Sequence, residues 1–374
     1  MTEAITNFGQ DLLLPLVDPG SRTFVPFVLI AMLIAWVFHR VSGHEGGWKA
    51  AFGVHLWRHA SSVLDAQLFL ARQLLRVLGI VPVLGGAVWL AVKVSTTLDS
   101  TFGIPEIEAP SPWVLSLSYS LVLFVLWDLS RFITHLALHK IPILWSFHQV
   151  HHSGEVLTPL TFHRTHPVES LLYGVRGVVS TGLMAGAAFW LFRGQASEYT
   201  ILGVHGLGLM FTAVTGNLRH SHVWIRFPAS VEQWLMSPAQ HQLHHSLDEA
   251  HFDANYGTWL SVWDRSIGSL KISPAQPIAQ VGLSNPNHNP HDLFSVLLAP
   301  FGEALRGLSW TRTAVPAAIL MMALSGLAHA EEDPDESADG TMIITAESGA
   351  PRIAGAAHII DEKMLEQHEY TDIH

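Results

Sequence analysis

Three short segments of the chain each carry two or three histidines at helical spacing. They are His135-Leu-Ala-Leu-His139, His148-Gln-Val-His151-His152 and His241-Gln-Leu-His244-His245. Residues three or four positions apart share one face of a helix, so each segment can present its imidazoles to a single point. Packing so many imidazoles together without a metal would leave donors and acceptors unpaired. We therefore interpret the three clusters as a metal site.

The number of histidines in these clusters predicts two metal ions rather than one. Eight imidazoles exceed what one ion can bind, whereas two ions would take four or five nitrogens each. The chain has no cysteine, which excludes a disulfide framework, an iron–sulfur cluster and a thiolate zinc site. Imidazole suits zinc, copper, iron and nickel, so ligand type leaves the metal open. Two redox metals at a membrane surface favour oxygen activation by iron, with zinc as an alternative occupant.

The composition indicates that these clusters are attached to a membrane protein. Charged residues make up 14 % of the 374 residues, and hydrophobic residues make up 49 %. Soluble proteins carry about 25 % charged residues. Five apolar runs approach the length of about 20 residues that crosses a bilayer. These runs are Phe24–Phe38, Val77–Leu98, Trp113–Trp127, Leu171–Phe192 and Tyr199–Leu218. The short linker between the last two predicts a helical hairpin.

Lysine and arginine are unevenly distributed between the segments that connect these runs. Residues 39–76 hold five of them, whereas the loop 99–112 holds none. By the positive-inside rule, residues 39–76, 131–176 and 219–271 face the cytoplasm, which places all three histidine clusters on that side. We therefore expect an all-α, integral-membrane helical bundle of about four to five spans. A cytoplasmic helical cap would carry the histidine-rich dimetal site, and the membrane would be a bacterial inner membrane.

One segment before the clusters is amphipathic rather than apolar. Ala51–Arg76 places five apolar residues on one face and four charged residues elsewhere. The apolar residues are Leu56, Val63, Leu64, Leu68 and Leu75, and the charged residues are Arg58, Asp65, Arg72 and Arg76. This pattern predicts a helix that lies on the cytoplasmic surface of the membrane.

The net charge of −11 comes almost entirely from the end of the chain. Residues 331–374 hold twelve acids and two bases and sum to −10, so residues 1–330 sum to −1. No part of the chain is basic enough to indicate binding to nucleic acid.

The end of the chain has a composition unlike that of residues 1–310. Arg312 precedes the apolar run Ala314–Leu327, and the segment 311–330 ends in an Ala-x-Ala pattern like that of a secretory signal peptide. The acidic residues 331–374 that follow resemble the start of a TonB-dependent receptor plug. Two joined reading frames would explain this layout, and an extra terminal span with a disordered acidic tail is the alternative. We assign neither segment a catalytic role.

Several motifs together resemble the fatty acid hydroxylase and sterol desaturase superfamily over about residues 25–300. Besides the three histidine clusters, the motifs are Trp127-Asp128, Arg164-Thr-His-Pro-Val-Glu169, Arg219-His-Ser-His222, Asn255-Tyr-Gly257 and Trp263-Asp-Arg265. The segment Ser266-Ile-Gly-Ser departs from the Leu-Phe-Gly-Thr that is more usual there, and His222 stands where Asn is common. These departures bear on the substrate more than on metal binding.

The resemblance implies a membrane di-iron oxygenase that uses O2 and a separate electron donor of the ferredoxin or cytochrome type. His220 stands where family members place a further histidine, and His166 is a weaker candidate. The implied metal ligands are His135, His139, His148, His151, His152, His220, His241, His244 and His245.

Other residues near the clusters have candidate supporting roles. Asp128 lies seven residues before His135, two turns away on the same helical face. We predict that it supports the site by accepting a hydrogen bond from a liganding imidazole, the alternative being a residue that ends a span. Four aromatic residues could line a substrate channel or belong to the core. They are Trp145, Phe147, Phe162 and Tyr173.

The expected activity is O2-dependent hydroxylation or desaturation of a membrane lipid, with sterol, fatty acyl, ether lipid and carotenoid substrates all open. A non-catalytic metal transporter or sensor is the alternative, but a transporter would place its ligands on broken helices near the bilayer midplane. A zinc hydrolase would need the Glu of an HExxH motif, which the clusters lack.

Overall fold

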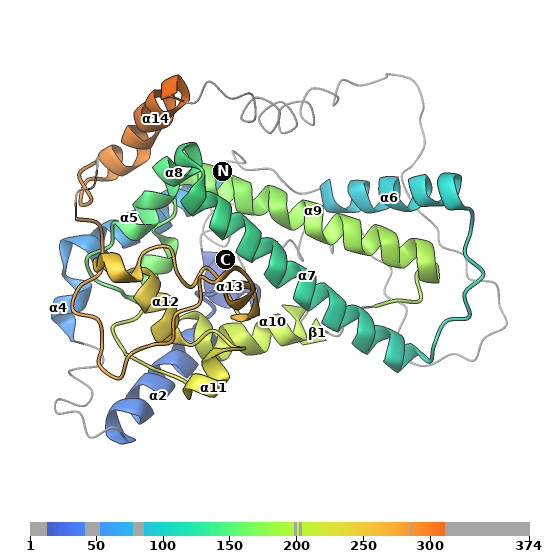
Figure 1. Cartoon of the computed structure of the whole chain (residues 1–374), viewed down its shortest axis with the longest axis horizontal. Helices are drawn as coiled ribbons and strands as arrows, with labels where there is room; N and C mark the ends of the chain where they lie inside the picture. The colour runs from blue at the N-terminus through green and yellow to red at the C-terminus, as the bar shows by residue number, and fades with distance from the viewer. Residues whose placement is uncertain are drawn as a thin grey trace, which may run out of the picture.

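The computed structural model describes residues 13–41, 53–77, 86–197, 200–201, 204–284, 286 and 288–310. The signal-peptide-like segment 311–330 and the acidic segment 331–374 lie outside these residues. Within the described part the regular secondary structure is helical, apart from a pair of two-residue antiparallel strands, Thr200–Ile201 (β1) and Val204–His205 (β2) (Figure 1).

Two helices are long and apolar enough to cross a membrane, judged by length and composition. They are α7 (Pro112–Lys140) and α9 (Pro167–Phe192). The shorter apolar helix α2 (Val25–Val41) covers the first predicted run. Helix α6 (Gly86–Phe102) covers the end of the second run, and residues 78–85 of that run lie outside the described part. The exact number of spans stays a prediction.

Small residues allow α6 and α9 to pack closely, and Figure 1 shows the two helices side by side. A Cβ atom added to Gly186 would lie 2.6 Å from the carbonyl oxygen of Ala91 and 2.7 Å from Cβ of Val94. Gly182, one turn earlier, is similarly crowded by Leu90. Paired small residues at this spacing are a typical contact between membrane helices, where close backbone approach replaces the hydrophobic driving force.

The prediction of a spanning helix over residues 199–218 was wrong. The structure places β1 and β2 there, followed by the short helix α10 (Gly206–Phe211) and the π-helical turn η2 (Thr212–Gly216). His205 explains where α10 begins, because its Nδ1 atom accepts a hydrogen bond from the Gly208 N–H at 3.3 Å and its Nε2 atom lies 3.0 Å from the Ser120 carbonyl oxygen. An apolar composition over the length of a span therefore does not produce one continuous helix here.

Short helices gather around the carboxyl-terminal end of α7 (Figure 1). Helix α8 (Pro142–His152) follows α7 directly and contacts both α7 and α14 (Leu293–Trp310). The other short elements of this region are α4 (Val54–Trp57), α5 (Ala60–Val77), η1 (Pro159–His163), α11 (Ala229–Glu232), α12 (Pro238–His244), η3 (Glu249–His251) and α13 (Val262–Ile267). Together they form the region that carries the histidine clusters.

The predicted amphipathic helix exists as α5, which begins at Ala60 rather than at residue 51. Its residues Leu64 and Leu68 are buried against Val150 and Val296, whereas Val63, predicted on the same face, is 46 % exposed. Asp65 was expected on the polar face, but the structure buries it completely. Asp65 can be buried because its carboxylate forms an ion pair with Arg164.

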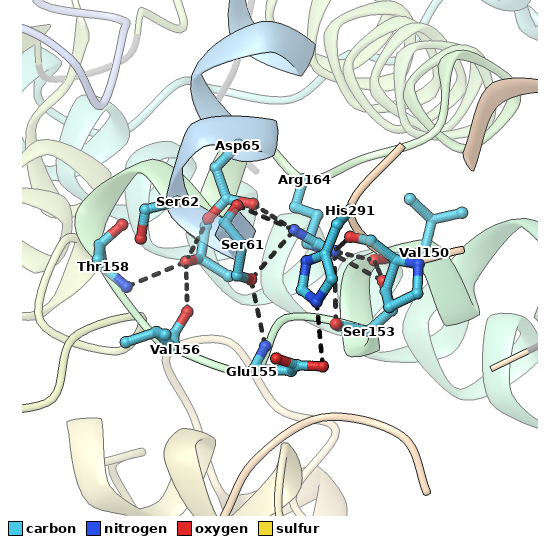
Figure 2. A network of polar contacts seen from close by, with 12 residues as sticks. Ser61, Ser62, Asp65, Val150, Ser153, Glu155, Val156, Thr158, Arg164 and His291 are labelled. Atoms are coloured by element: carbon cyan, nitrogen blue, oxygen red, sulfur yellow. Dashed lines mark hydrogen bonds and ion pairs between the residues drawn. The ribbon is translucent and has the colours of Figure 1, made fainter. Parts of the chain in front are cut away.

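The Asp65–Arg164 ion pair joins α5 to the end of α8 (Figure 2). Arg164 Nη1 donates to Asp65 Oδ1 at 2.8 Å, and both side chains are fully buried. Arg164 Nε also donates to the Val150 carbonyl oxygen and to Ser153 Oγ, each at 3.1 Å. Burial raises the pKa of the Asp65 carboxyl, and the Arg164 charge opposes that rise. The pair therefore anchors the helix that carries His148, His151 and His152.

Candidate metal centre

The structure brings all nine predicted ligands into two adjacent groups. Within each group, one nitrogen from every histidine lies within 4.8 Å of those of the others. The first group contains His135, His139, His148, His152 and His244. The second group contains His151, His220, His241 and His245.

Four parts of the chain supply these side chains, and two helices supply both groups. Helix α7 carries His135 and His139, and His220 lies in the segment that follows η2. Helix α8 supplies His148 and His152 to the first group and His151 to the second. Helix α12 supplies His244 to the first group and His241 to the second, and its carboxyl-terminal cap residue, His245, joins the second group. The two groups therefore share the same two supporting helices.

Local capping explains why so short a segment as α12 is helical. Ser237 precedes the helix and its hydroxyl accepts from the Gln240 N–H at 3.1 Å, while Gln240 Oε1 accepts from the Ser237 N–H at 3.0 Å. Pro238 occupies the first helical position. This reciprocal capping box satisfies donors that would otherwise be unpaired at the helix start.

The nitrogens that face the centre of the first group fit a metal ion. The Nε2 atoms of His139, His148, His152 and His244 are buried and have no hydrogen-bond partner among the described residues. On the opposite side of the rings, Nδ1 of His135 lies 2.7 Å from the Tyr256 carbonyl oxygen, and Nδ1 of His244 lies 2.7 Å from that of Ala254. A carbonyl accepts only from an Nδ1–H, so these rings carry their proton there and present the Nε2 lone pair to the centre.

The spacing of nitrogens in the second group also fits a metal ion. Nε2 of His220 lies 3.1 Å from Nε2 of His151 and 3.0 Å from Nε2 of His241. Metal–nitrogen bonds of about 2.0–2.1 Å place neighbouring ligand nitrogens about 3 Å apart. The arrangement therefore matches a shared ion at least as well as it matches hydrogen bonds between rings.

Burial keeps these imidazoles in the state that binds metals. It lowers the pKa of His148 and His151 to about 3 and the pKa of His244 to about 4. The pKa of His152, His220, His241 and His245 also lies well below the usual value, again mainly because of burial. The rings are therefore neutral at physiological pH, as metal coordination requires.

The predicted contact between Asp128 and an imidazole is not present among the described residues. Its carboxylate instead accepts hydrogen bonds from the Trp259 N–H at 3.0 Å, the Leu260 N–H at 3.1 Å and Trp263 Nε1 at 2.8 Å. Asp128 does lie on α7 two turns before His135, as predicted. However, its carboxylate is occupied by the segment that contains Trp259 and Trp263. Asp128 thus attaches this segment to α7.

A different carboxylate, Glu169, supports the first group, and sequence reasoning assigned it no role. Glu169 lies in the first turn of α9, and its Oε1 atom is 2.9 Å from Nδ1 of His148. Both side chains are buried. The sequence could have pointed to Glu169, because it is the only acid in the Arg-x-His-Pro-x-Glu motif. The spacing of residues within that motif, however, does not predict a contact with His148 on α8.

Replacing Glu169 with Gln should weaken metal binding about 10–100-fold, because the uncharged amide is a poorer acceptor for the His148 Nδ1–H. The measurement is the metal affinity of the purified full-length chain, by competition with a chelator. Glu155→Gln is the control, since the Glu155 side chain is 47 % exposed and makes only weak surface pairs. An unchanged affinity in the Glu169 variant would contradict the role.

The weaker candidate His166 does not join either group. It caps the start of α9, where its Nδ1 atom accepts from the Val168 N–H at 3.1 Å and its Nε2 atom lies 3.1 Å from the Leu297 carbonyl oxygen. Both ring nitrogens therefore have structural partners, and the suggestion that His166 binds metal was wrong.

The four aromatic candidates divide between pocket and core. Phe162 and Tyr173 line a pocket that reaches histidines of both groups. The Trp145 ring lies 5.1 Å from that of His139, whereas Phe147 packs on Phe301 at 5.3 Å in the core. The same pocket is lined by charged side chains, namely Arg22, Arg131, Arg219 and Glu169.

The comparisons with known proteins agree with this geometry. The family described as fatty acid hydroxylase matches residues 120–269, a range that includes both histidine groups and Glu169. The matches support the fatty acid hydroxylase superfamily. No solved structure matches the chain.

Three curated relatives illustrate the range of similar proteins. Rat cholesterol 25-hydroxylase is 28 % identical over 45 % of this chain and 51 % of its own length. Human alkylglycerol monooxygenase is 25 % identical over 50 % of this chain and 38 % of its own. Ornithine lipid hydroxylase OlsE of Rhizobium tropici is 26 % identical over 47 % of this chain and 48 % of its own. This chain therefore spans about half the length, or less, of the relatives it matches.

Proposed function

We propose that this chain is a membrane-bound, O2-dependent lipid hydroxylase whose nine clustered histidines hold two iron ions. One observation carries the proposal: a five-histidine group and a four-histidine group lie side by side. In the first group the buried Nε2 atoms of four histidines have no partner among the described residues, and in the second group Nε2 of His220 lies 3.1 Å from that of His151 and 3.0 Å from that of His241. Bound iron would supply the reduction of O2 and the oxidation of an unactivated carbon–hydrogen bond, with zinc as a possible substitute occupant.

The chain's own residues would hold and orient this centre. The histidines of α7, α8 and α12 bind the ions, and Glu169 fixes the orientation of His148. Buried surroundings exclude water, which protects a strong oxidant from side reactions. Since the described residues contain no cysteine or flavin-type glycine motif, the electrons would come from a separate ferredoxin- or cytochrome-type donor.

The names of the relatives support a lipid substrate and favour hydroxylation over desaturation. Cholesterol 25-hydroxylase, alkylglycerol monooxygenase and ornithine lipid hydroxylase all name an oxygen insertion into a lipid. The apolar helices α7 and α9 support access from a membrane. The proposed location is a bacterial inner membrane, with the histidine region on the cytoplasmic side.

The test is lipid oxidation under ¹⁸O2 by the iron-loaded full-length chain in lipid nanodiscs, supplied with reduced ferredoxin. A sterol, a fatty acid, an ether lipid and a carotenoid are offered separately, and products are identified by mass spectrometry. We expect one ¹⁸O atom in the product from one lipid class. A protein that contains two iron ions but oxidises none of the four classes would count against the proposal.

A further inference from the structure

The pocket beside the two histidine groups is unusually polar for a lipid-binding site. Phe162 is the only purely apolar side chain in its lining. The charged lining residues are Arg22, Arg131, Arg219 and Glu169. Sites for apolar chains are lined mainly by hydrophobic side chains, so these charges need another explanation.

Arg219 has donors that the protein does not use. Its side chain is 3 % exposed, and Nη1 donates to the Thr258 carbonyl oxygen at 2.8 Å. Its Nε and Nη2 atoms are buried and have no hydrogen-bond partner among the described residues. Buried guanidinium groups normally use most of their five donors, because an unpaired buried donor is costly.

Two further buried arginines reach the same pocket. Arg131 Nε donates to Thr258 Oγ1 at 3.2 Å, next to the Thr258 carbonyl that Arg219 uses. The Arg22 guanidinium lies 4.2 Å above the Phe162 ring, and its Nη1 atom donates to the Gly216 carbonyl oxygen at 3.3 Å. Three cations from three separate parts of the chain therefore converge on one small space.

The lining of the pocket itself supplies little negative charge. Glu169 is the only carboxylate in its lining, and its Oε1 atom already pairs with His148. Its Oε2 atom has no hydrogen-bond partner among the described residues, so it would repel an anion on its own side of the pocket. Asp128 interacts electrostatically with Arg131 and Arg219 from outside the lining. The two buried Arg219 donors without a partner among the described residues, rather than a count of charges, therefore mark the place for an anion.

We propose that this pocket binds an anionic oxygen group, a carboxylate or a phosphate, of the lipid substrate. Arg219 supplies the main contact, and Arg131 and Arg22 supply the supporting charge, since guanidinium groups suit planar or tetrahedral oxyanions. The carbon that is oxidised then lies close to the head group rather than far along the chain. This inference rests on the proposed function in one respect, namely that the substrate is a lipid.

The test compares lipids that share one chain and differ in the head group. Binding of radiolabelled palmitate, hexadecyl phosphate and hexadecan-1-ol to the full-length, metal-containing protein is measured in an uncharged detergent, without O2 or electron donor. We expect both anions to bind at least about tenfold more tightly than the alcohol, as hydrogen bonds to a charged group imply. Excess inorganic phosphate should compete far less well than unlabelled hexadecyl phosphate.

Variants assign this preference to the pocket. Arg219→Gln should weaken binding of both anions about tenfold and leave the alcohol unchanged. Arg131→Gln provides a second variant if the first does not fold, as judged by thermal melting. Arg226→Gln is the matched control, because Arg226 is exposed on the same region and does not line the pocket.

Equal affinity for the three lipids in the unmodified protein would overturn the inference, and this comparison needs no variant. Equal competition by inorganic phosphate would instead indicate a site for a free anion and would also overturn it. Because the assay is independent of turnover, an inactive protein that still prefers anions contradicts only the proposed function. A protein that oxidises lipids without an anion preference contradicts only this inference.

Discussion

His241→Ala should remove about one of two bound metal ions per chain and reduce lipid oxidation by more than about 100-fold. His241 is one of only four ligands in its group, so its loss leaves three nitrogens. Removing a group that merely supports a ligand already costs about 10–100-fold, and removing the ligand itself should cost more. Metal content per full-length chain, by mass spectrometry of the purified protein, is the direct measurement.

The division into two groups makes a more specific prediction for paired variants. His148→Ala combined with His152→Ala leaves three nitrogens in the first group, so it should empty that group and leave the second loaded. Adding His241→Ala should leave no stoichiometric metal. His251→Ala is the control, because His251 is in neither group and its Nδ1 atom contacts Ser246 Oγ at 3.0 Å. Two metal ions retained in His241→Ala, or none in the well-folded unmodified protein, would refute the two-ion centre.

Asp65→Asn should lower the free energy of unfolding by about 3–5 kcal/mol, the typical cost of removing one partner from a buried ion pair. Asparagine cannot neutralise Arg164, which would stay buried as an unpaired cation. For a chain of this size the loss corresponds to a fall in melting temperature of roughly 5 °C. Thermal melting of the detergent-purified protein, followed by tryptophan fluorescence, measures it.

The chain contains a matched control for this substitution. Asp99 and Arg193 form an ion pair on the surface, where the side chains are 31 % and 33 % exposed. Asp99→Asn should change the melting temperature little, because water already screens that pair. Similar shifts in the two variants would show that burial of the Asp65–Arg164 pair does not matter. A fall confined to Asp65→Asn would confirm that this pair holds α5 against the end of α8.

Several features of the site were predictable because they depend on short-range geometry. The three histidine clusters needed only residue type and helical spacing, and α7, α8 and α12 are helical where those spacings lie. The amphipathic pattern of α5 also placed Leu64 and Leu68 on one apolar face, but it predicted a helix on the membrane surface, whereas both residues pack on Val150 and Val296. Asp65 was misplaced because a helical pattern treats every charge as exposed, whereas a partner 99 residues away makes its burial possible.

The sequence by itself determined which histidines are available as ligands and that α7 and α9 are long apolar helices. Only the tertiary structure decided which histidine of each triple joins which group. Helical spacing gives His148, His151 and His152 one common face, but the crossing of α8 with α7 and α12 separates His151 from the other two. The same holds for carboxylates, because Glu169 reaches His148 across 21 residues while Asp128 is occupied by backbone donors 131 and 132 residues away. Contacts over such separations depend on how helices pack, and local spacing carries no information about that packing.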